Sequence, residues 1–555
     1  MNFKYLYRLG LLIIFLCMSA YSAKAVGSLY DQHWPKREQR AVWLTTIGGL
    51  DWPHCYAQSR YSIEKQKAEL ITILDKLHHA GINTVLLQTR IRGTVIYPSA
   101  IEPWDGCCSG VPGKSPGYDP LQFAIEQCHK RGMELQAWIV TVPVGRWNAL
   151  GCKTLRKKHP HLVVQVQGEG YINPASPQAK TYLANICAEI TRRYDIDGIH
   201  LDYIRYPETW HLAIGADVAR HNITAIVEEV NKTVKHVKPW VKTSSSPIGK
   251  YADLTRYSSK GWSAYNRGYQ DAKQWLQQGY MDELYPMMYF RDNQFYPFAA
   301  DWRETGAYPI ASGIGIYQLL PSEANWSIDE VVRQLNVSRR LGLGQAFFRS
   351  KFLTDDVKGI YTYVANHFYR YPALLPVNPY HNATVAPPVD LKVMKGLTIR
   401  LFWNEPQQKS STPLYYNVYA SNSWPVDVDN PQCLLAVRQS RCSMTIEGAN
   451  YQYWAVTAMD SYGNESVALQ QPSPKGMSVL GLLPNDGIWL KLRHASETMA
   501  LLKDLTGRTV SIKSIVKDKG VSISHLAPGY YYAYSLNKKG ITHRLGLFMI
   551  SKKSK

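Results

Sequence analysis

The stretch DGIHLDYIRYP, at residues 197–207, decides the fold because it has the pattern of a buried β-strand that ends in polar side chains. Side chains alternate along a strand, so His200 and Asp202 share one face while Ile199 and Leu201 share the other. If the apolar pair packs on helices, the polar pair points toward the mouth of a barrel. A carboxylate at that depth is costly unless it is hydrogen-bonded or takes part in chemistry. We therefore expect Asp202 to be functional, with the fixing of neighbouring backbone as the structural alternative.

Similar apolar runs recur eight times within residues 40–371, and stretches with apolar residues three and four apart, such as Ile63–His79 and Ile328–Leu341, lie between them. The runs are Ala41–Ile47, Thr84–Gln88, Leu135–Thr141, Gly198–Ile204, Val241–Ser246, Glu283–Tyr289, Ile310–Ile316 and Gln345–Phe348. This alternation predicts an α/β chain whose first domain, residues 35–380, is a (β/α)8 TIM barrel with functional side chains at the C-terminal strand ends. Asp197, at the other end of its strand, is expected to be structural.

The chain changes character after this domain, where short strands with alternating apolar residues begin. Residues 385–474 resemble a fibronectin type III β-sandwich, with Trp403 in the core and YWAVTAMDSYGNES at 453–466 as the penultimate strand and its turn. Residues 478–555 predict a small all-β domain. This last domain resembles the C-terminal sorting domains of the type IX secretion pathway, and a plain accessory β-domain is the alternative.

The N-terminal residues have the pattern of an export signal. Lys4 and Arg8 precede the apolar run Leu9–Ala20, and small residues follow it, so residues 1–25 predict a secretory signal peptide. A lipoprotein anchored at Cys17 is the alternative. No later apolar stretch reaches the roughly 20 residues of a membrane helix, so no transmembrane segment is expected after signal removal. We expect an exported protein of the periplasm or cell envelope.

The cysteines do not form a disulfide framework. Eight of the nine cysteines remain after signal removal, which is few for a chain of this length. Cys433 and Cys442 are the expected pair because they lie close together in a strand-rich segment. Cys107 and Cys108 would form a strained ring if bonded to each other. The sequence has no CxxC and no HExxH motif, so we expect no metal site and no cofactor.

The composition, with 45% hydrophobic and 12% aromatic residues, excludes a disordered chain and a coiled coil. The 16 Trp and 38 Tyr side chains have flat apolar faces, which suit sugar rings as well as cores. The formal net charge is +20, and residues 475–555 supply +10 of it through 14 basic and four acidic side chains. This tail suggests attraction to anionic cell-envelope polymers, with solvation of a β-domain as the alternative. Export and the absence of a binding motif argue against nucleic acid as a partner.

Five motifs give a more specific resemblance. They are EQRAVWLTTIGGLDWP (38–53), LLQTRIRGTVIYPSAIEPW (86–104), QAWIV (136–140), INPASPQAKTYLANICAEITRRYDIDGIHLDYIRYP (172–207) and YMDELYPMMYF (280–290). In this order and spacing, about residues 35–375 resemble the glycosyl hydrolase-like 10 family, which includes an enzyme that cleaves peptidoglycan strands stripped of their stem peptides. The resemblance implies a (β/α)8 glycosidase barrel with a polysaccharide or oligosaccharide substrate. Thr94 stands where the family more commonly has an acidic residue.

The resemblance also implies substrate-binding side chains near the ends of several strands. With His200, which shares the face of the candidate carboxylate, they are Asp51, Trp52, Gln88, Arg90, Trp138, Tyr203 and Tyr289. Four of them have a structural alternative: Arg90 as a clamp on a structural carboxylate, Asp51 as the cap of a turn, Trp52 as a residue that packs under that loop, and Trp138 as a core residue.

Glycoside hydrolysis uses two carboxyl groups, one of which donates a proton. Asp202 is the first candidate. Glu208 is the expected proton donor because desolvation beside aromatic side chains would raise its pKa, and a solvated loop glutamate is the alternative. Asp292, after the sixth strand, competes for the second role.

The sequence therefore favours an exported glycoside hydrolase that acts on a cell-envelope polysaccharide, with peptidoglycan as one candidate. The rival hypothesis is a non-catalytic glycan-binding protein on a glycosidase-like barrel. A serine hydrolase has no support because no GxSxG motif occurs.

Overall fold

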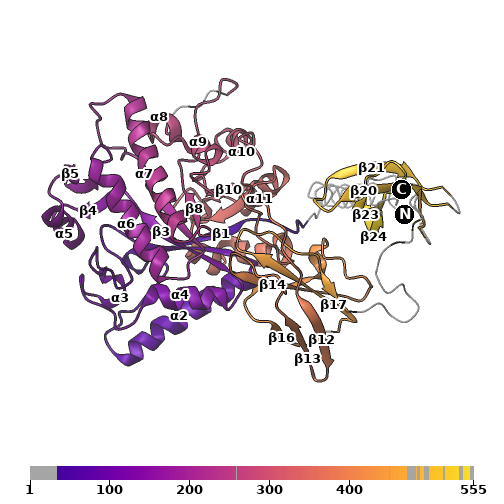
Figure 1. The fold of residues 1–555 in the computed structure, drawn as a ribbon. Coiled ribbons are helices and arrows are strands. Elements are labelled where there is room, and N and C mark those ends of the chain that lie inside the picture. The colour runs from indigo at the N-terminus through magenta and orange to yellow at the C-terminus, as the bar shows by residue number, and fades with distance from the viewer. Residues whose placement is uncertain are drawn as a thin grey trace, which may run out of the picture.

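The computed structural model describes residues 34–550 apart from 258, 260, 449, 472–482, 484, 486, 487, 493–498, 517, 518 and 537–541. The expected signal peptide lies outside these residues. A barrel, a two-sheet β-sandwich and a small C-terminal β unit follow each other along the described chain (Figure 1). Within this part of the chain, every helix is too short or too polar to cross a membrane.

Eight parallel strands of the described chain form the barrel. They are β1 (Arg40–Leu44), β2 (Thr84–Arg90), β3 (Glu134–Val140), β7 (Gly198–Asp202), β8 (Lys242–Ser245), β9 (Glu283–Leu284), β10 (Ala311–Ile314) and β11 (Gly344–Phe347). Neighbours in the sheet follow chain order, and β11 also pairs with β1. A parallel bridge between Leu284 and Ile310 joins β9 to β10 and closes the ring. The predicted (β/α)8 barrel is confirmed.

Helices cover the outside of the strands (Figure 1). They are α2 (Arg60–His79), α3 (Gly106–Ser109), α4 (Pro120–His129), α5 (Leu150–Lys158), α6 (Pro177–Arg193), α7 (Ala216–Val237), α8 (Ala264–Arg267), α9 (Ala272–Gln277), α10 (Tyr296–Arg303), α11 (Ile328–Arg340), α12 (Ser350–Thr354) and α13 (Ile360–Tyr363). The 3-10 and π-helical turns of the barrel are η1 (Ile47–Gly49), η2 (Asp292–Gln294), η3 (Ile316–Leu319), η4 (Val357–Gly359) and η5 (Val364–Phe368).

A small inserted sheet interrupts the alternation of barrel strands and helices. The antiparallel strands β4 (Pro143–Arg146), β5 (Val163–Val166) and β6 (Glu169–Ile172) lie between β3 and α6.

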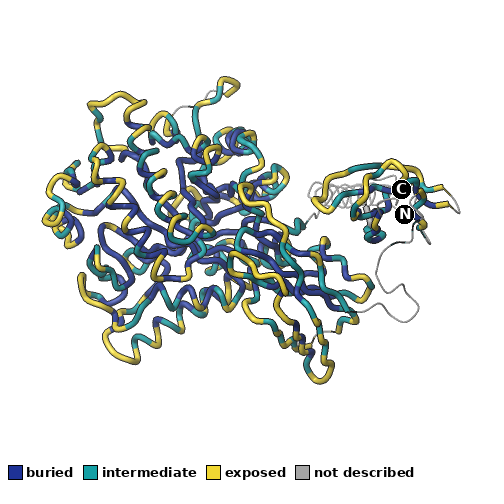
Figure 2. Tube along the Cα trace, viewed as in Figure 1, coloured by how far each residue is buried: buried dark blue, intermediate teal, exposed yellow. Residues whose placement is uncertain are grey.

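The alternation along β7 is as the sequence predicts. Ile199 and Leu201 belong to the apolar core between strands and helices. His200 and Asp202 lie on the other face, inside the barrel, where they contact side chains of neighbouring strands. Figure 2 shows the central strands buried throughout, so the barrel is a packed core whose chemistry is confined to its ends.

The N-terminal half of the barrel interior contains a connected set of polar side chains. The Lys242 ammonium lies 2.9 Å from a Glu134 carboxylate oxygen and 2.7 Å from a Glu283 oxygen. Gln136 donates to Glu283 over 2.8 Å and accepts from the Ser244 hydroxyl over 2.6 Å. Buried polar groups are tolerated because each finds a partner. We name this set, with His200 above it, the polar axis of the barrel.

The β-sandwich consists of two antiparallel sheets. One contains β12 (Val389–Lys395), β13 (Thr398–Asn404) and β16 (Ser443–Glu447); the other contains β15 (Leu434–Gln439), β14 (Leu414–Ser421), β17 (Tyr453–Asp460) and β18 (Leu469–Gln470). The predicted core residue Trp403 packs with Tyr416 and Trp454 between the sheets. The likeness to a fibronectin type III domain stays a prediction.

An arginine of the sandwich is buried in the N-terminal face of the barrel. Arg438 lies 2.9 Å from a Glu134 oxygen and 2.5 Å from an Asp197 oxygen. Burial raises the pKa of Asp197, but Arg438 and His129 lower it by more, and it ends well below its usual value. Asp197 is therefore structural, as expected. Gly132 permits the close approach, because a Cβ there would lie 2.3 Å from the carbonyl oxygen of Val437.

The C-terminal β unit has its own small core. A four-stranded sheet is formed by β21 (Thr509–Ser514), β20 (Met499–Asp504), β23 (Gly529–Leu536) and β24 (Thr542–Ile550), and β19 (Trp489–Leu490) pairs with β22 (Val521–Ser522). Leu502, Val521 and Phe548 are buried together in this unit. Its resemblance to a sorting domain stays a prediction.

The predicted disulfide between Cys433 and Cys442 is wrong for this structure, in which both thiols are free. Cys433 packs with Leu374 and Tyr419 on the barrel side of the sandwich. Cys442 packs in the core between the two sheets. The two side chains therefore lie on opposite sides of one sheet. Their closeness in sequence did not reveal this, because it says nothing about the direction of each side chain.

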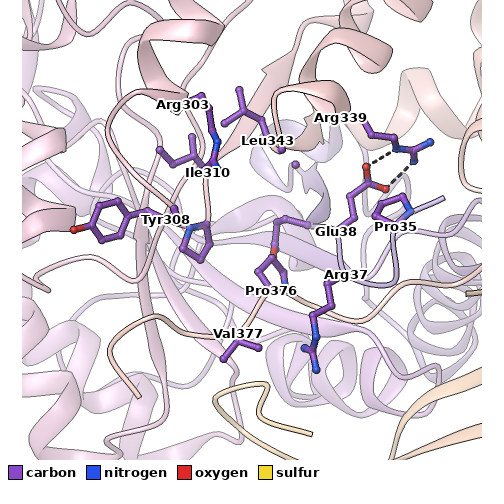
Figure 3. Close-up of a pocket in the computed structure, with 15 residues that line it drawn as sticks. Pro35, Arg37, Glu38, Arg303, Tyr308, Ile310, Arg339, Leu343, Pro376 and Val377 are labelled. Carbon is purple, nitrogen blue, oxygen red and sulfur yellow. Dashed lines mark hydrogen bonds and ion pairs between the residues drawn. The ribbon is translucent and has the colours of Figure 1, made fainter. Parts of the chain in front are cut away.

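A cavity of about 280 Å³ opens at the N-terminal edge of the barrel, beside the segment that leads to the sandwich (Figure 3). Gln39, Ile310 and Leu343, which line it, come just before strands begin. Glu38 accepts hydrogen bonds from Arg339 there over 2.7 and 2.8 Å. Because (β/α)8 enzymes use the opposite, C-terminal face, this cavity is not the candidate site.

The Arg438 ion pairs predict a stability effect. Arg438→Met would remove a cation that two buried carboxylates share, so that Glu134 keeps only Lys242 and Asp197 keeps only His129. We expect the free energy of unfolding at pH 7 to fall by about 3–5 kcal/mol. Because the folded pKa of Asp197 is lowered, the stabilisation is present above about pH 4 and is lost as pH falls below it. Denaturant unfolding of both proteins across this pH range measures the difference.

The control is Arg192→Met, at an exposed position of α6, with an expected change within about 0.5 kcal/mol. Equal losses in the two variants would contradict the account of the interface.

Candidate functional site

Asp202 ends β7 and is held by donors from three places at the mouth of the barrel. The Trp138 indole N–H donates to Oδ2 over 3.0 Å. The Ser246 hydroxyl and the Tyr203 backbone N–H each donate to Oδ1 over 2.8 Å. Although these contacts fix its orientation, 9% of Asp202 remains exposed. The carboxylate is thus oriented by β3, by the residue after β8 and by its own strand end, and it is accessible from the mouth.

His200 lies one layer deeper and is fully buried. Its Nε2 accepts from the Trp43 indole N–H over 3.2 Å, and its Nδ1 lies 2.9 Å from the Ser244 hydroxyl. Because that hydroxyl donates to Gln136, Nδ1 carries the imidazole proton. Burial lowers the pKa of His200 to about 3. The structure therefore corrects the predicted substrate-binding role: His200 is a neutral support beneath the mouth.

Aromatic rings surround the mouth. The Tyr289 ring lies 5.2 Å from Phe348 and 5.9 Å from Tyr317, and Trp43 lies 5.9 Å from Phe348. Burial raises the pKa of Tyr289 well above its usual value, and the Asp202 carboxylate adds to the rise. Tyr289 is thus a neutral phenol beside the candidate carboxylate, partly exposed as a substrate-binding residue must be.

Tyr203, Arg205 and Glu208 form a group on the loop after β7. The Arg205 guanidinium lies 3.7 Å from the centre of the Tyr203 ring and 2.8 Å from a Glu208 oxygen. Burial raises the pKa of Glu208, but Arg205 lowers it by more, and it ends below its ordinary value. The expected upward shift is therefore wrong. Arg205, three residues earlier in the chain, outweighs the effect of burial on Glu208.

Asp292 lies in η2 and 62% of its side chain is exposed. Its carboxylate is 2.9 Å from Arg333 of α11. Among the described residues it makes no hydrogen bond or ion pair with Asp202. The structure thus shows Asp292 engaged by Arg333 of α11, and its role as the second carboxylate stays a prediction.

Asp51 and Trp52 support the loop after β1. Asp51 accepts hydrogen bonds from the backbone and side chain of Thr45, both over 2.7 Å, and pairs with Arg349. Trp52 is fully buried, and its indole N–H donates to the Gln66 carbonyl over 2.9 Å. Both side chains make contacts inside the protein, which favours the structural alternative for each, and the substrate-binding role of Asp51 stays a prediction because this residue also lines a cavity with Lys351.

The predicted substrate-binding residues of β2 and β3 also make contacts that stabilise the barrel itself. Arg90 is fully buried and clamps Glu102 with contacts of 2.8–3.1 Å, so its clamp alternative holds. Gln88 accepts through its amide oxygen from the backbone of Thr46 and Ile47 over 3.0 and 2.9 Å. Trp138 is only 4% exposed, which leaves it too little surface for sugar stacking. Its contribution is the hydrogen bond that orients the candidate carboxylate.

Sequence reasoning missed Ser246 and Trp43. Ser246 is the last residue of the predicted strand Val241–Ser246, so its place at a C-terminal strand end was a usable signal. Trp43 reaches inward because it alternates with the buried Val42 and Leu44, but this became clear only from the packing. Within the described residues, no group of three or more His, Cys, Asp or Glu side chains is arranged to hold a metal ion.

The chain is similar to known proteins in this same region. The model of the family "Glycosyl hydrolase-like 10" matches residues 38–214 and 211–318. Glycosyl hydrolase YngK of Bacillus subtilis is 30% identical over 479 residues, which cover 78% of this chain and 92% of that protein. Glycosyl hydrolase DigH of Escherichia coli K12 is 30% identical over 368 residues, which cover 57% of this chain and 83% of that protein.

Among solved structures, the PgaB (BpsB) glycoside hydrolase domain from Bordetella bronchiseptica is 13% identical, with a TM-score of 0.43, and covers 59% of this chain and 98% of that one. By its fold and its strand-end carboxylate, the protein is a glycosidase-like (β/α)8 barrel. The chain belongs to the glycosyl hydrolase-like 10 family.

The buried neutral histidine predicts a pH effect on stability. The unfolded chain takes up a proton at His200 below about pH 6.5, whereas the folded chain excludes it, so wild-type stability falls by about 1.4 kcal/mol for each pH unit below that value. His200→Gln lacks this group. Between pH 7 and 5, the stability difference between wild type and variant should shrink by about 2 kcal/mol in denaturant unfolding. Parallel pH profiles for the two proteins would show that the imidazole is not buried as a neutral group.

Proposed function

We propose that the protein is an exported glycoside hydrolase that cleaves a cell-envelope polysaccharide, with peptidoglycan glycan strands as substrate. The main structural observation in support is Asp202, an accessible carboxylate oriented by three hydrogen-bond donors at the C-terminal end of a barrel strand. Membership of a glycosyl hydrolase-like family supports hydrolysis. The peptidoglycan substrate and the export rest on the family resemblance and on the sequence of residues 1–25.

Asp202 suits the stabilisation of positive charge on a sugar ring. The transition state of glycoside hydrolysis resembles an oxocarbenium ion, and a fixed carboxylate beside the anomeric carbon opposes its charge. Trp138, Ser246 and the Tyr203 backbone hold the carboxylate without neutralising it, because all three are uncharged donors. Substrate binding then requires no reorganisation of this group.

Glu208 is the better candidate for the second carboxylate. It shares Arg205 and Tyr203 with the surroundings of Asp202, whereas Asp292 pairs with Arg333 on the outer helix α11. The ion pair with Arg205 favours a charged Glu208 in the free protein. Glu208 must therefore leave Arg205 and take up a proton from solvent before it can donate one to the leaving group.

Glycan binding without hydrolysis is the second candidate function. The observation in its favour is that Glu208 is engaged by Arg205 and Asp292 by Arg333, so neither is a free acid beside Asp202. The two candidates differ in one measurable respect, since only a hydrolase creates new reducing ends.

The hydrolase proposal predicts that Asp202→Asn folds normally and loses hydrolysis of peptide-free glycan strands by about 10³-fold, because the amide keeps the shape and loses the charge. Release of reducing ends measures turnover, and thermal unfolding checks the fold. The matched control is Asp195→Asn, since 70% of the Asp195 side chain is exposed. Turnover at the wild-type rate in Asp202→Asn would refute the assignment of Asp202.

The basic tail predicts attachment to anionic envelope polymers. Residues 475–555 carry a net charge of +10, and its attraction is screened within about 8 Å at physiological salt. A chain that ends at Pro474 should therefore pellet less with purified cell walls at low salt, while its turnover of a soluble oligosaccharide stays unchanged. The difference should vanish at high salt. Equal pelleting of both chains at every salt concentration would show that the tail's charge is not used in binding.

A further inference from the structure

Two aromatic side chains, one on the inserted sheet and one on the loop after β7, pack against each other beyond the residues that sequence reasoning assigned. Tyr171 lies on β6 of the inserted sheet, and Trp210 lies seven residues after Tyr203. The rings of Tyr171 and Trp210 are 6.3 Å apart and inclined by 47°. Both side chains are only partly buried. We name this pair the aromatic shelf.

The shelf is next to the candidate carboxylate. Burial raises the pKa of Tyr203, Arg205 opposes the rise, and Glu208, Asp202 and Tyr171 add to it. Asp202 and Tyr171 thus both act on the Tyr203 phenol. Backbone contacts also connect the two places, because the N–H of Thr141 donates to the Asp202 carbonyl over 2.9 Å and the next residue, Val142, accepts from Ile172 beside Tyr171.

Both rings of the shelf are held in place. The Trp210 ring packs edge-to-face with Tyr206 at 5.4 Å, and Asn222 of α7 donates to the Tyr206 hydroxyl over 3.1 Å. Tyr171 is paired with Val164 of β5 in the inserted sheet. Ordering these rings costs little upon binding because the protein has already fixed them.

The position of the inserted sheet gives it access to a ligand at the mouth. It leaves the barrel directly after β3, and the backbone N–H of Ile172 donates to the Val142 carbonyl over 2.8 Å. Additions at the C-terminal face of a (β/α)8 barrel are where such proteins build binding sites. A partly exposed tyrosine and tryptophan offer flat apolar faces with polar edges, which match the two faces of a pyranose ring.

We propose that Tyr171 and Trp210 form a sugar subsite beyond the cleavage point, which makes the protein select glycan chains over short oligosaccharides. This rests on the proposed function, because it takes Asp202 as the point of cleavage. The occupant is a neutral face of a sugar ring in the same chain, one or more residues away from the bond at Asp202. The protein then distinguishes long from short glycans because only a long glycan reaches both Asp202 and the two aromatic rings.

The test compares Trp210→Ala and Tyr171→Ala with wild type on peptide-free peptidoglycan glycan strands, separated into disaccharide, tetrasaccharide and octasaccharide. Loss of one stacking contact should lower kcat/KM on the octasaccharide by about tenfold and change it little on the shortest chain that is cleaved. The matched control is Trp240→Ala. Trp240 is also partly buried against the barrel core, but it lies before β8, at the opposite face.

Trp240→Ala should change kcat/KM by the same factor on glycans of every length, because it acts only through the stability of the protein. A length-dependent loss in the shelf variants alone supports the subsite. If Trp210→Ala and Tyr171→Ala keep the wild-type dependence on chain length, the proposal is overturned. Calorimetry that measures octasaccharide binding to wild type and to Trp210→Ala separates the sugar-subsite proposal from the hydrolase proposal. If wild type cleaves nothing but binds the chain through Trp210, the shelf stands and the hydrolase proposal fails.

Discussion

A lysine ammonium buried between two glutamates is the constraint on which the barrel interior depends. Burial lowers the pKa of Lys242, but Glu134 and Glu283 raise it by more, so the group stays charged. Without the ammonium, Glu283 would be a buried carboxylate with no cation beside it, which proteins avoid, and Glu134 would keep only Arg438. The same Glu134 also binds Arg438 of the sandwich, and Glu283 binds Gln136. One ion cluster therefore fixes both the attachment of the sandwich and the lower end of the polar axis.

The upper end of that axis supports the candidate site. Through Ser244, the polar axis reaches His200, whose neutral ring accepts from Trp43, and Trp43 packs against the aromatic mouth. Asp202 itself is oriented from neighbouring strands through Trp138 and Ser246. A carboxylate positioned by strands is held more rigidly than one positioned by loops, which is what preorganised stabilisation of charge requires. The rest of the candidate chemistry lies on the loop after β7, in Tyr203, Arg205 and Glu208.

The fold was predictable from the sequence, and most of the site was not. Apolar runs and helical spacing reveal the order of elements, and alternation along β7 places Asp202 inside the barrel without any knowledge of its neighbours. The partners of a polar side chain are long-range contacts, which no local pattern encodes. Arg90 therefore had two equal interpretations until Glu102 was found beside it. The pKa of Glu208 was predicted in the wrong direction because its closest charge, Arg205, was left out.

The central claim is that glycan chains bind across the C-terminal ends of the strands with a glycosidic bond at Asp202. A crystal structure of Asp202→Asn with a peptide-free peptidoglycan oligosaccharide tests it most directly. The account predicts an anomeric carbon about 3–3.5 Å from the side chain of residue 202, with the chain continuing toward Tyr171 and Trp210. A glycan bound away from residue 202, such as in the cavity beside Glu38 at the opposite face, would contradict it.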